Sequence, residues 1–162
     1  MTNTSLLRPP GRFLGAVAAA IAGVAFASVA LADECPADKR GVNVTKPGTM
    51  TSSGVTDTVL TSIDLSKQKL ALPDHQLRLR RLVIEPNGIV AWHSHEDRPA
   101  IIYIISGQVY EHASNCSVPI LHRAGDVTPE SSGTAHWWQN TGRETVVLLS
   151  ADILHDANDH NM

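Results

Sequence analysis

The sequence is poor in cysteine, in aromatic residues and in excess basic charge. Its 162 residues contain two cysteines, and only 4% of them are aromatic. Thirteen Lys and Arg stand against 16 Asp and Glu, a net charge of −3. Two cysteines exclude a disulfide-dense scaffold, and the acidic balance argues against nucleic acid, whose phosphates require a basic surface. The 43% of residues that are hydrophobic suffice for the core of one domain.

One long uncharged run lies at the N-terminus. Arg8 and Arg12 precede the uncharged residues 13–32, which end in the small-x-small pattern Ala30-Leu31-Ala32. This arrangement predicts a signal peptide over residues 1–32 and an exported, periplasmic or secreted protein without stable membrane insertion after cleavage. An uncleaved anchor is the alternative, since about 20 apolar residues can cross a bilayer. Cleavage would leave 11 Lys and Arg against 16 Asp and Glu, a net charge of −5.

Export gives the two cysteines a context. An oxidising compartment allows Cys35 and Cys116 to form a disulfide that ties an N-terminal arm to the domain. Such a bond restricts the unfolded chain by about 3–4 kcal/mol. Two free or intermolecularly paired thiols are the alternative.

The rest of the chain indicates short strands. Residues 33–54 are polar and interrupted by Pro and Gly, which predicts an arm or linker. Residues 55–155 hold runs rich in Val, Ile, Leu and Thr, separated by turn residues, and none shows helical periodicity. The runs are 55–65, 76–86, 100–112 and 145–153. This pattern predicts an all-β antiparallel sandwich or barrel, followed by a polar tail at 156–162.

Two adjacent arginines, Arg80 and Arg81, break the alternation in one run. Either a β-bulge shifts the phase there or one arginine points inward. Two solvated cations are the simpler interpretation. In the other interpretation Arg81, in phase with Leu77, Leu79 and Val83, anchors an anion inside the barrel.

Three histidines are candidate metal ligands. His93 and His95 lie two apart in "WHSHEDRPAIIYIISG", and residues two apart in a strand share a face. His136, in "AGDVTPESSGTAHWWQN", offers a third imidazole, and Trp138 shares its face if this segment is extended. Surface histidines are the alternative for the first pair.

The spacing of these residues resembles the two motifs of the cupin superfamily. The residues similar to the first motif are Pro86, His93, His95 and Gly107, and those similar to the second are Gly125, Gly133, His136 and Asn140. The resemblance covers about residues 55–153 and implies a cupin-type antiparallel β-barrel or jelly roll of six to eight strands. It also implies a homodimer, because cupins commonly pair through their outer sheets.

One departure from the motifs bears on the chemistry. The glutamate that cupins use as a fourth ligand falls on Ala100, whose methyl group cannot coordinate a metal. Glu96 or Asp97 swinging inward is the alternative source of a carboxylate. Three neutral imidazoles leave a divalent ion (Fe, Mn, Ni, Zn or Cu) with its full charge and with open positions that favour an anionic ligand.

The resemblance therefore implies a metal-binding cupin with His93, His95 and His136 as ligands. Three-histidine cupins include iron dioxygenases, which makes a dioxygenase acting on a small anionic substrate one hypothesis. A non-catalytic periplasmic module that binds a metal or small ligand is the second, and a structural barrel is the third. The expected pocket residues are Trp138, Ile102, Ile104 and Arg81, and no catalytic acid or base is nominated.

Overall fold

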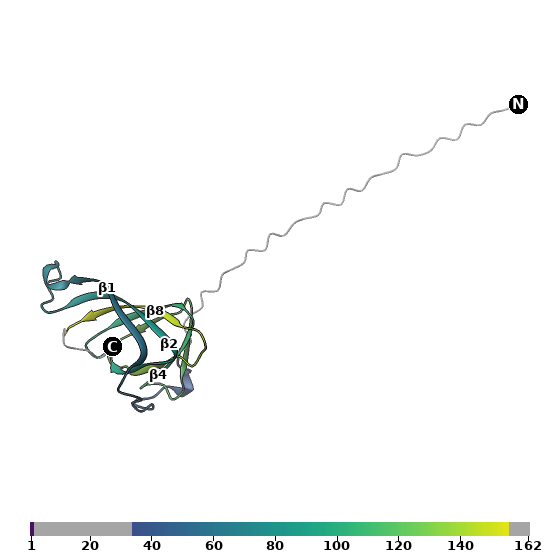
Figure 1. Ribbon diagram of the computed structural model, residues 1–162, viewed down its shortest axis with the longest axis horizontal. Coiled ribbons are helices and arrows are strands. Elements are labelled where there is room, and N and C mark those ends of the chain that lie inside the picture. The colour runs from purple at the N-terminus through teal and green to yellow at the C-terminus, as the bar shows by residue number, and fades with distance from the viewer. Residues whose placement is uncertain (2–33, 156–162) are drawn as a thin grey trace.

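The computed structural model describes Met1 and residues 34–155; the rest of the predicted signal peptide and the polar tail lie outside the described residues. The described part is almost entirely β-structure, so the predicted fold class is confirmed (Figure 1). Its elements are η1 (Ala37–Lys39), β1 (Ser53–Asp64), η2 (Leu65–Lys67), β2 (Gln76–Ser94), β3 (Ala100–Ser106), β4 (Gln108–Ala113), β5 (Ile120–Arg123), β6 (Val127–Glu130), β7 (Ala135–Gln139) and β8 (Val146–Leu154). Among these residues no helix has the length and apolar character needed to cross a membrane.

The strands form one antiparallel sheet that curls into a half-barrel. Their order is β5-β4-β7-β2-β8-β3-β6, with β1 paired to β2 outside this path. The two outermost strands, β5 and β6, are consecutive in the chain and are joined by a turn at residues 124–126. Because this turn is short, the two ends of the sheet lie close together and the sheet must curl. Gly125 makes the turn with a φ of 96°, which side chains rarely permit.

Alternate side chains point into the half-barrel. Burial follows a period of two along β3, β7 and β8, as expected for strands with one face on a core. The core residues are Leu82, Ile84, Val90, Ala100, Ile102, Ile104, Val109, Trp138, Val146 and Leu148. Burial of each large apolar side chain stabilises the fold by about 1.5–3 kcal/mol. Part of this core also forms the wall of the candidate site.

β2 changes phase along its length, and this change brings the histidines inside. Its first half buries Arg80, Leu82 and Ile84. Its pairing with β7 then shifts register between Val90 and His93, so that an odd-numbered residue faces inward there. A bulge of this kind is typical next to a functional site.

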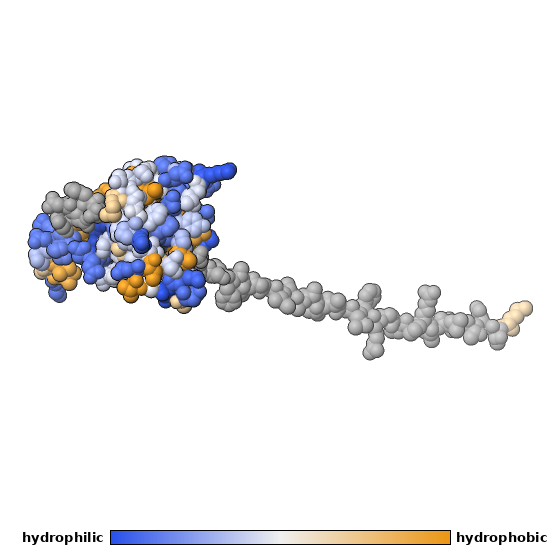
Figure 2. Space-filling view, turned by 90° about the horizontal axis from the view of Figure 1, so that it is seen from below, coloured by the Kyte–Doolittle hydropathy of each residue, from blue (hydrophilic) through white to orange (hydrophobic). Residues whose placement is uncertain are grey.

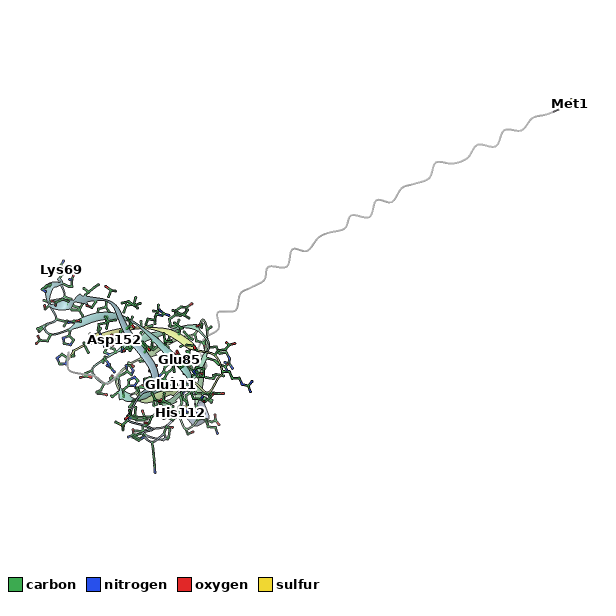
Figure 3. The ribbon with its side chains drawn as sticks, viewed as in Figure 1. Met1, Lys69, Glu85, Glu111, His112 and Asp152 are labelled. Atoms are coloured by element: carbon green, nitrogen blue, oxygen red, sulfur yellow. A yellow bond between two sulfur atoms is a disulfide. The ribbon has the colours of Figure 1, made fainter. Side chains whose placement is uncertain are left out.

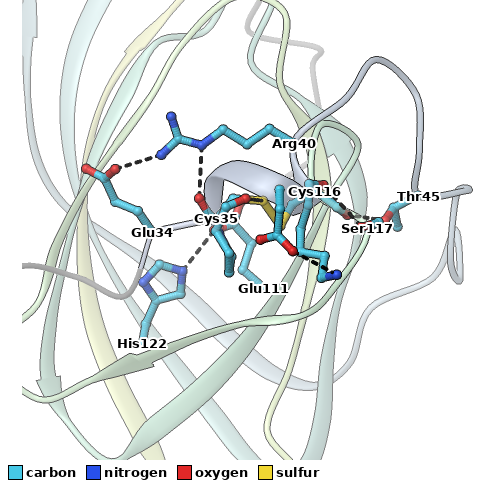
Figure 4. Close-up of a disulfide and its surroundings, with 11 residues drawn as sticks. Glu34, Cys35, Arg40, Thr45, Glu111, Cys116, Ser117 and His122 are labelled. Carbon is cyan, nitrogen blue, oxygen red and sulfur yellow. Dashed lines mark hydrogen bonds and ion pairs between the residues drawn. A yellow bond between two sulfur atoms is a disulfide. The ribbon is translucent and has the colours of Figure 1, made fainter.

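A disulfide between Cys35 and Cys116 ties the N-terminal arm to the half-barrel. The arm is also held by a hydrogen bond from the Val44 N–H to the Ser114 carbonyl (2.9 Å) and by one from the Thr45 hydroxyl to the Cys116 carbonyl. Figure 4 shows that the disulfide lies beside Glu111, which connects the arm to the flank of the candidate site.

β1 and the start of β2 form a hairpin whose tip, near Lys69, lies away from the Glu111 region of the half-barrel (Figure 3). Almost every β1 residue is exposed, including the consecutive Val59 (52%) and Leu60 (50%). Because consecutive strand residues point to opposite faces, both faces of this strand are uncovered.

The outer face of the sheet is also partly apolar. On β3 the exposed side chains are Ile101, Tyr103 and Ile105, and Val127 on the neighbouring β6 is exposed too. Several separate apolar patches lie among polar residues on the face shown in Figure 2.

Candidate metal centre

β2 and β7 bring the three predicted histidines together. His93 lies directly opposite His136 in the register of these strands, and His95 follows the last residue of β2. All three are buried, with exposed fractions of 8% for His93, 3% for His95 and 1% for His136. The alternative of a surface pair is therefore wrong for His93 and His95.

The three Nε2 atoms converge on one point. They lie 3.1 Å apart between His93 and His95, 3.0 Å apart between His95 and His136, and 3.1 Å apart between His93 and His136. Each Nδ1 has its own acceptor: the carbonyl of Ala91 (2.9 Å), the carbonyl of Arg98 (2.8 Å) and the Glu111 carboxylate (2.6 Å), respectively. Since Nδ1 donates in every ring, the neutral rings all direct an Nε2 lone pair at the common point.

This donor set fits a divalent cation. Three nitrogens about 2.1 Å from one ion are about 3.0 Å apart when they meet at right angles, and about 3.4 Å apart in a tetrahedron. The observed separations are thus close to those of nitrogens that share one ion. Imidazole nitrogen is a ligand that Fe, Ni, Cu and Zn all accept, so the donors identify a metal site without naming the metal.

The environment keeps two of the rings neutral. Burial, together with the charge of His136, lowers the pKa of His95 to about 4 and the pKa of His93 well below its usual value. Burial opposes protonation of His136 as well, but the Glu130 charge and the Glu111 hydrogen bond outweigh it and raise its pKa. Of the three rings, His136 is thus the one whose surroundings favour the protonated form.

Two glutamates and a fourth histidine surround the back of His136. Glu111, on β4, accepts from His136 Nδ1 at 2.6 Å and from His122 Nε2 at 2.8 Å, and Glu130 Oε2 lies 3.6 Å from the same Nδ1. Although burial acts to raise it, the two hydrogen bonds lower the pKa of Glu111 to about 2. Burial and the neighbouring Glu111 raise the pKa of Glu130 to about 8.

Sequence reasoning missed this second group. Glu111, His122 and Glu130 match no motif position, and three different strands bring them to one place. The one local signal is the alternation of burial, since Glu111 and His122 each fall on the inward face of a short strand.

A cavity of about 30 Å³ adjoins the three histidines. Besides them it is lined by Arg80, Leu82, Val90, Ile102, Trp138, Leu148 and Ser150. Two of the four expected pocket residues, Ile102 and Trp138, are therefore in its wall. Ile104 belongs to the core instead and is not part of this lining.

The expectation for Arg81 is wrong, because Arg81 is exposed and Arg80 points inward. Arg80 contacts Asp57 (2.5 Å) and Asp152 (3.2 Å), and Arg78 also binds Asp152. Two arginines and two aspartates thus form a balanced charge network across β1, β2 and β8. Because its charge is balanced in this network, the Arg80 guanidinium can be buried beside the cavity.

A family model for the cupin domain matches residues 80–152, a span that contains all three histidines. The chain is a small cupin. An oxalate-binding protein of Thermotoga maritima is 36% identical to it over 74 residues, which make up 46% of this chain and 60% of that protein. The aligned part is thus less than two thirds of that relative.

A solved structure shares the fold. This cupin superposes on the crystal structure of a predicted oxalate decarboxylase from Thermotoga maritima with a TM-score of 0.52 and 22% identity, covering 75% of this chain and 98% of the other. The cupin domain of Cnp3 from Schizosaccharomyces pombe has a TM-score of 0.49 and 12% identity, covering 64% of this chain and 66% of the other. At these identities the likeness concerns the fold alone. With its histidine group, the chain is a metal-binding cupin.

In this cupin no acidic residue near the first motif replaces the missing glutamate. Ala100 is buried on β3, where the motif places a ligand. Glu96 is exposed and accepts a hydrogen bond from the Gly133 N–H (3.0 Å), and Asp97 is exposed as well. Both side chains thus lie toward the solvent. Imidazole is therefore the one type of donor in the group of His93, His95 and His136.

Proposed function

We propose that the protein is exported and binds a small carboxylate anion, with oxalate as the first candidate, at a divalent metal held by His93, His95 and His136. The observation that carries the proposal is the convergence of three Nε2 atoms within 3.0–3.1 Å beside a very small cavity. A bound cation would supply Lewis acidity and a positive charge for the anion. The curated relative that binds oxalate supports this choice of anion.

The size of the cavity favours a ligand of few atoms. A volume of about 30 Å³ is room for about two water molecules. Its walls are mainly apolar, formed by residues such as Leu82, Ile102 and Trp138. A compact anion needs far less additional space beside the metal than an aromatic acid of the gentisate type does.

A metal-dependent dioxygenase is the second candidate function. What favours it is the donor set, because three neutral imidazoles leave the ion more open positions than a set completed by Glu. In that case the residues of this chain orient the anion and exclude water, and Trp138 and Leu148 close the space around it.

One experiment separates these functions. The mature protein is purified without oxygen, its metal content is determined, and oxalate is titrated calorimetrically before and after chelation. We expect about one metal per chain and oxalate binding that chelation abolishes. His136→Ala should lose both, whereas His75→Ala, outside the site and stacked on His155, should keep both.

Oxygen uptake with a panel of small anions decides on catalysis. Uptake that requires metal and His136 supports the dioxygenase, whereas oxalate binding without turnover supports the binding module. Metal-free protein that gains no stability from added metal contradicts both.

Export rests on the N-terminal pattern and is supported by the bond between Cys35 and Cys116, because disulfides persist in oxidising compartments. Mass spectrometry of the protein from the producing cell tests it. The expected mature chain begins at Asp33, and an intact Met1 on intracellular protein contradicts the proposal.

A further inference from the structure

The three candidate ligands differ in the group that accepts a hydrogen bond from their Nδ1 atom. His93 and His95 donate their Nδ1–H groups to backbone carbonyls, which are neutral. His136 donates to the carboxylate of Glu111, and at 2.6 Å this is the shortest of the three hydrogen bonds. Hydrogen bonds to a charged acceptor are shorter and about twice as strong as neutral ones. Only His136, therefore, has a negative charge bonded directly to its far side.

Two carboxylates flank the place of the missing ligand, and among the described residues one of their oxygens, Glu130 Oε1, has no hydrogen-bond partner. Ala100 lies opposite Glu130 on one neighbouring strand and opposite Asp152 on the other. Asp152 is bound by Arg78 at 2.6 Å and by Arg80 at 3.2 Å, so its charge is compensated. Glu130 is 3.6 Å from His136 Nδ1, which is the side of the ring away from the converging Nε2 atoms.

We infer that Glu111 supplies, through His136, the negative charge that the cupin motif's glutamate would supply by direct coordination. Glu111 is then a positioning residue, because it acts on the metal only through the imidazole. It fixes the hydrogen on Nδ1, sets the plane of the ring and makes Nε2 a stronger electron donor. The inference rests on the proposed metal site.

The surroundings hold Glu111 in this role. Its second oxygen accepts from His122 Nε2 at 2.8 Å, and the Thr128 hydroxyl lies 3.1 Å from the other nitrogen of that ring. The His122 ring stacks on Trp138 with centroids 4.9 Å apart. The Glu111 side chain is 4% exposed, so water barely competes for its oxygens and the interaction is weakly screened.

Formal charges show the consequence of replacing a coordinating glutamate by Glu111, which acts through His136. Three neutral imidazoles and a divalent ion carry +2, and the Glu111 carboxylate reduces the local total to +1. A set of three histidines and one coordinating glutamate has the same total. The difference is that Glu111 occupies no coordination position, so one more position is open to an external anion at unchanged overall charge.

Metal affinity of the Glu111→Gln variant tests the inference. Glutamine has the same shape, its carbonyl can accept from His136, and its N–H can donate to His122 once that ring shifts its hydrogen toward Thr128. The substitution thus removes the charge and keeps the hydrogen-bond chain. The matched control is Glu130→Gln, which replaces a carboxyl group that lies near the same nitrogen without a hydrogen bond.

Dissociation constants for Zn²⁺ and Co²⁺ are measured by competition with a chelator, and the Co²⁺ absorption spectrum is recorded. We expect Glu111→Gln to bind both ions about 10–100-fold more weakly, with shifted Co²⁺ bands. The control should leave the Co²⁺ bands in place, because Glu130 makes no hydrogen bond that fixes the His136 ring. A change confined to thermal stability, with wild-type constants and bands, overturns the inference.

The outcomes separate the inference from the site on which it rests. Wild-type protein that binds no metal refutes the proposed metal site, whereas wild-type binding with an equally tight Glu111→Gln variant refutes only the role of Glu111. If Glu111→Gln does not fold, Glu111→Asp replaces it, since the shorter side chain keeps the charge but withdraws it from His136. Weaker binding with altered Co²⁺ bands then supports the inference, and unchanged constants overturn it.

Discussion

Metal binding by this protein should depend on pH far less steeply than the presence of three histidines suggests. A histidine must lose its proton before it binds a metal. A lowered pKa keeps a ring in the neutral, ligating form as the pH falls. For His95, whose pKa is about 4, and for His93, protons compete with metal only in strongly acidic solution. The pKa of His136 is raised, so metal must displace a proton from this ring at any pH below that value.

The magnitude follows from the number of protons released. Between pH 6.5 and 5, three ordinary histidines with pKa values of about 6.5 would weaken binding by about 4,000-fold. If His136 alone is protonated in this range, the apparent Kd rises by about 20–30-fold, close to tenfold per pH unit. The two cases differ by more than a hundredfold, which is well beyond experimental error.

The assay is a set of Co²⁺ or Zn²⁺ titrations at half-unit steps across this range, with calorimetry in two buffers of different ionisation enthalpy to count protons. The control is Glu130→Gln, which removes a carboxyl group whose pKa of about 8 allows it to release a second proton when the ion binds. A slope approaching a thousandfold per pH unit in this variant would refute the reasoning, because it requires all three rings to be protonated.

Three further predictions concern the scaffold. Replacing Cys35 and Cys116 by serine removes a disulfide across a sequence separation of 81 and should lower the free energy of unfolding by about 3–4 kcal/mol in urea titrations; a loss below about 1 kcal/mol contradicts a tethering role. Arg80→Met removes the arginine that pairs with Asp57 and one of the two that pair with Asp152, and should cost about 3–5 kcal/mol, whereas Arg81→Met should cost less than about 0.5 kcal/mol in the same assay. We also expect a homodimer in sedimentation experiments, and Tyr103→Asp on the outer face should shift it to monomer if this face is the interface.

The histidines could be predicted because their signal is local. His93 and His95 need only an extended backbone to share a face, and the spacing to His136 matches a family motif. In the structure these histidines are buried and their Nε2 atoms converge, as a shared inward face predicts. A period of two is robust wherever the strand is regular.

The sequence could not show which of Arg80 and Arg81 faces inward, because apolar residues lie on both faces of β2. Leu77, Leu79 and Val83 suggested that the odd positions of β2 face inward, but the structure buries Arg80, Leu82 and Ile84. The odd residues lie on an outer face that is itself apolar, so hydrophobicity marks both sides of this strand. The wrong prediction for Arg81 is thus a consequence of the apolar outer face, which is also the face on which we expect the dimer interface.

Glu111, His122 and Glu130 could not be found from sequence because their meeting depends on strand pairing. Glu111 faces Ile120 on β5 and Trp138 on β7, and Glu130 faces Ala100 on β3. Each pairing is set by register across many residues and leaves no short motif. Acidic residues on small strands otherwise indicate solvent exposure.

The separation of the ligands along the chain affects the order in which the site assembles. His93 and His95 are neighbours even in an unfolded polypeptide, whereas His136 reaches them only after β7 has paired with β2 across 43 residues. An ion captured early by the two nearby rings would wait for its third donor and would then favour the closed register over misaligned ones. Metal supplied during refolding should therefore speed the last step of assembly.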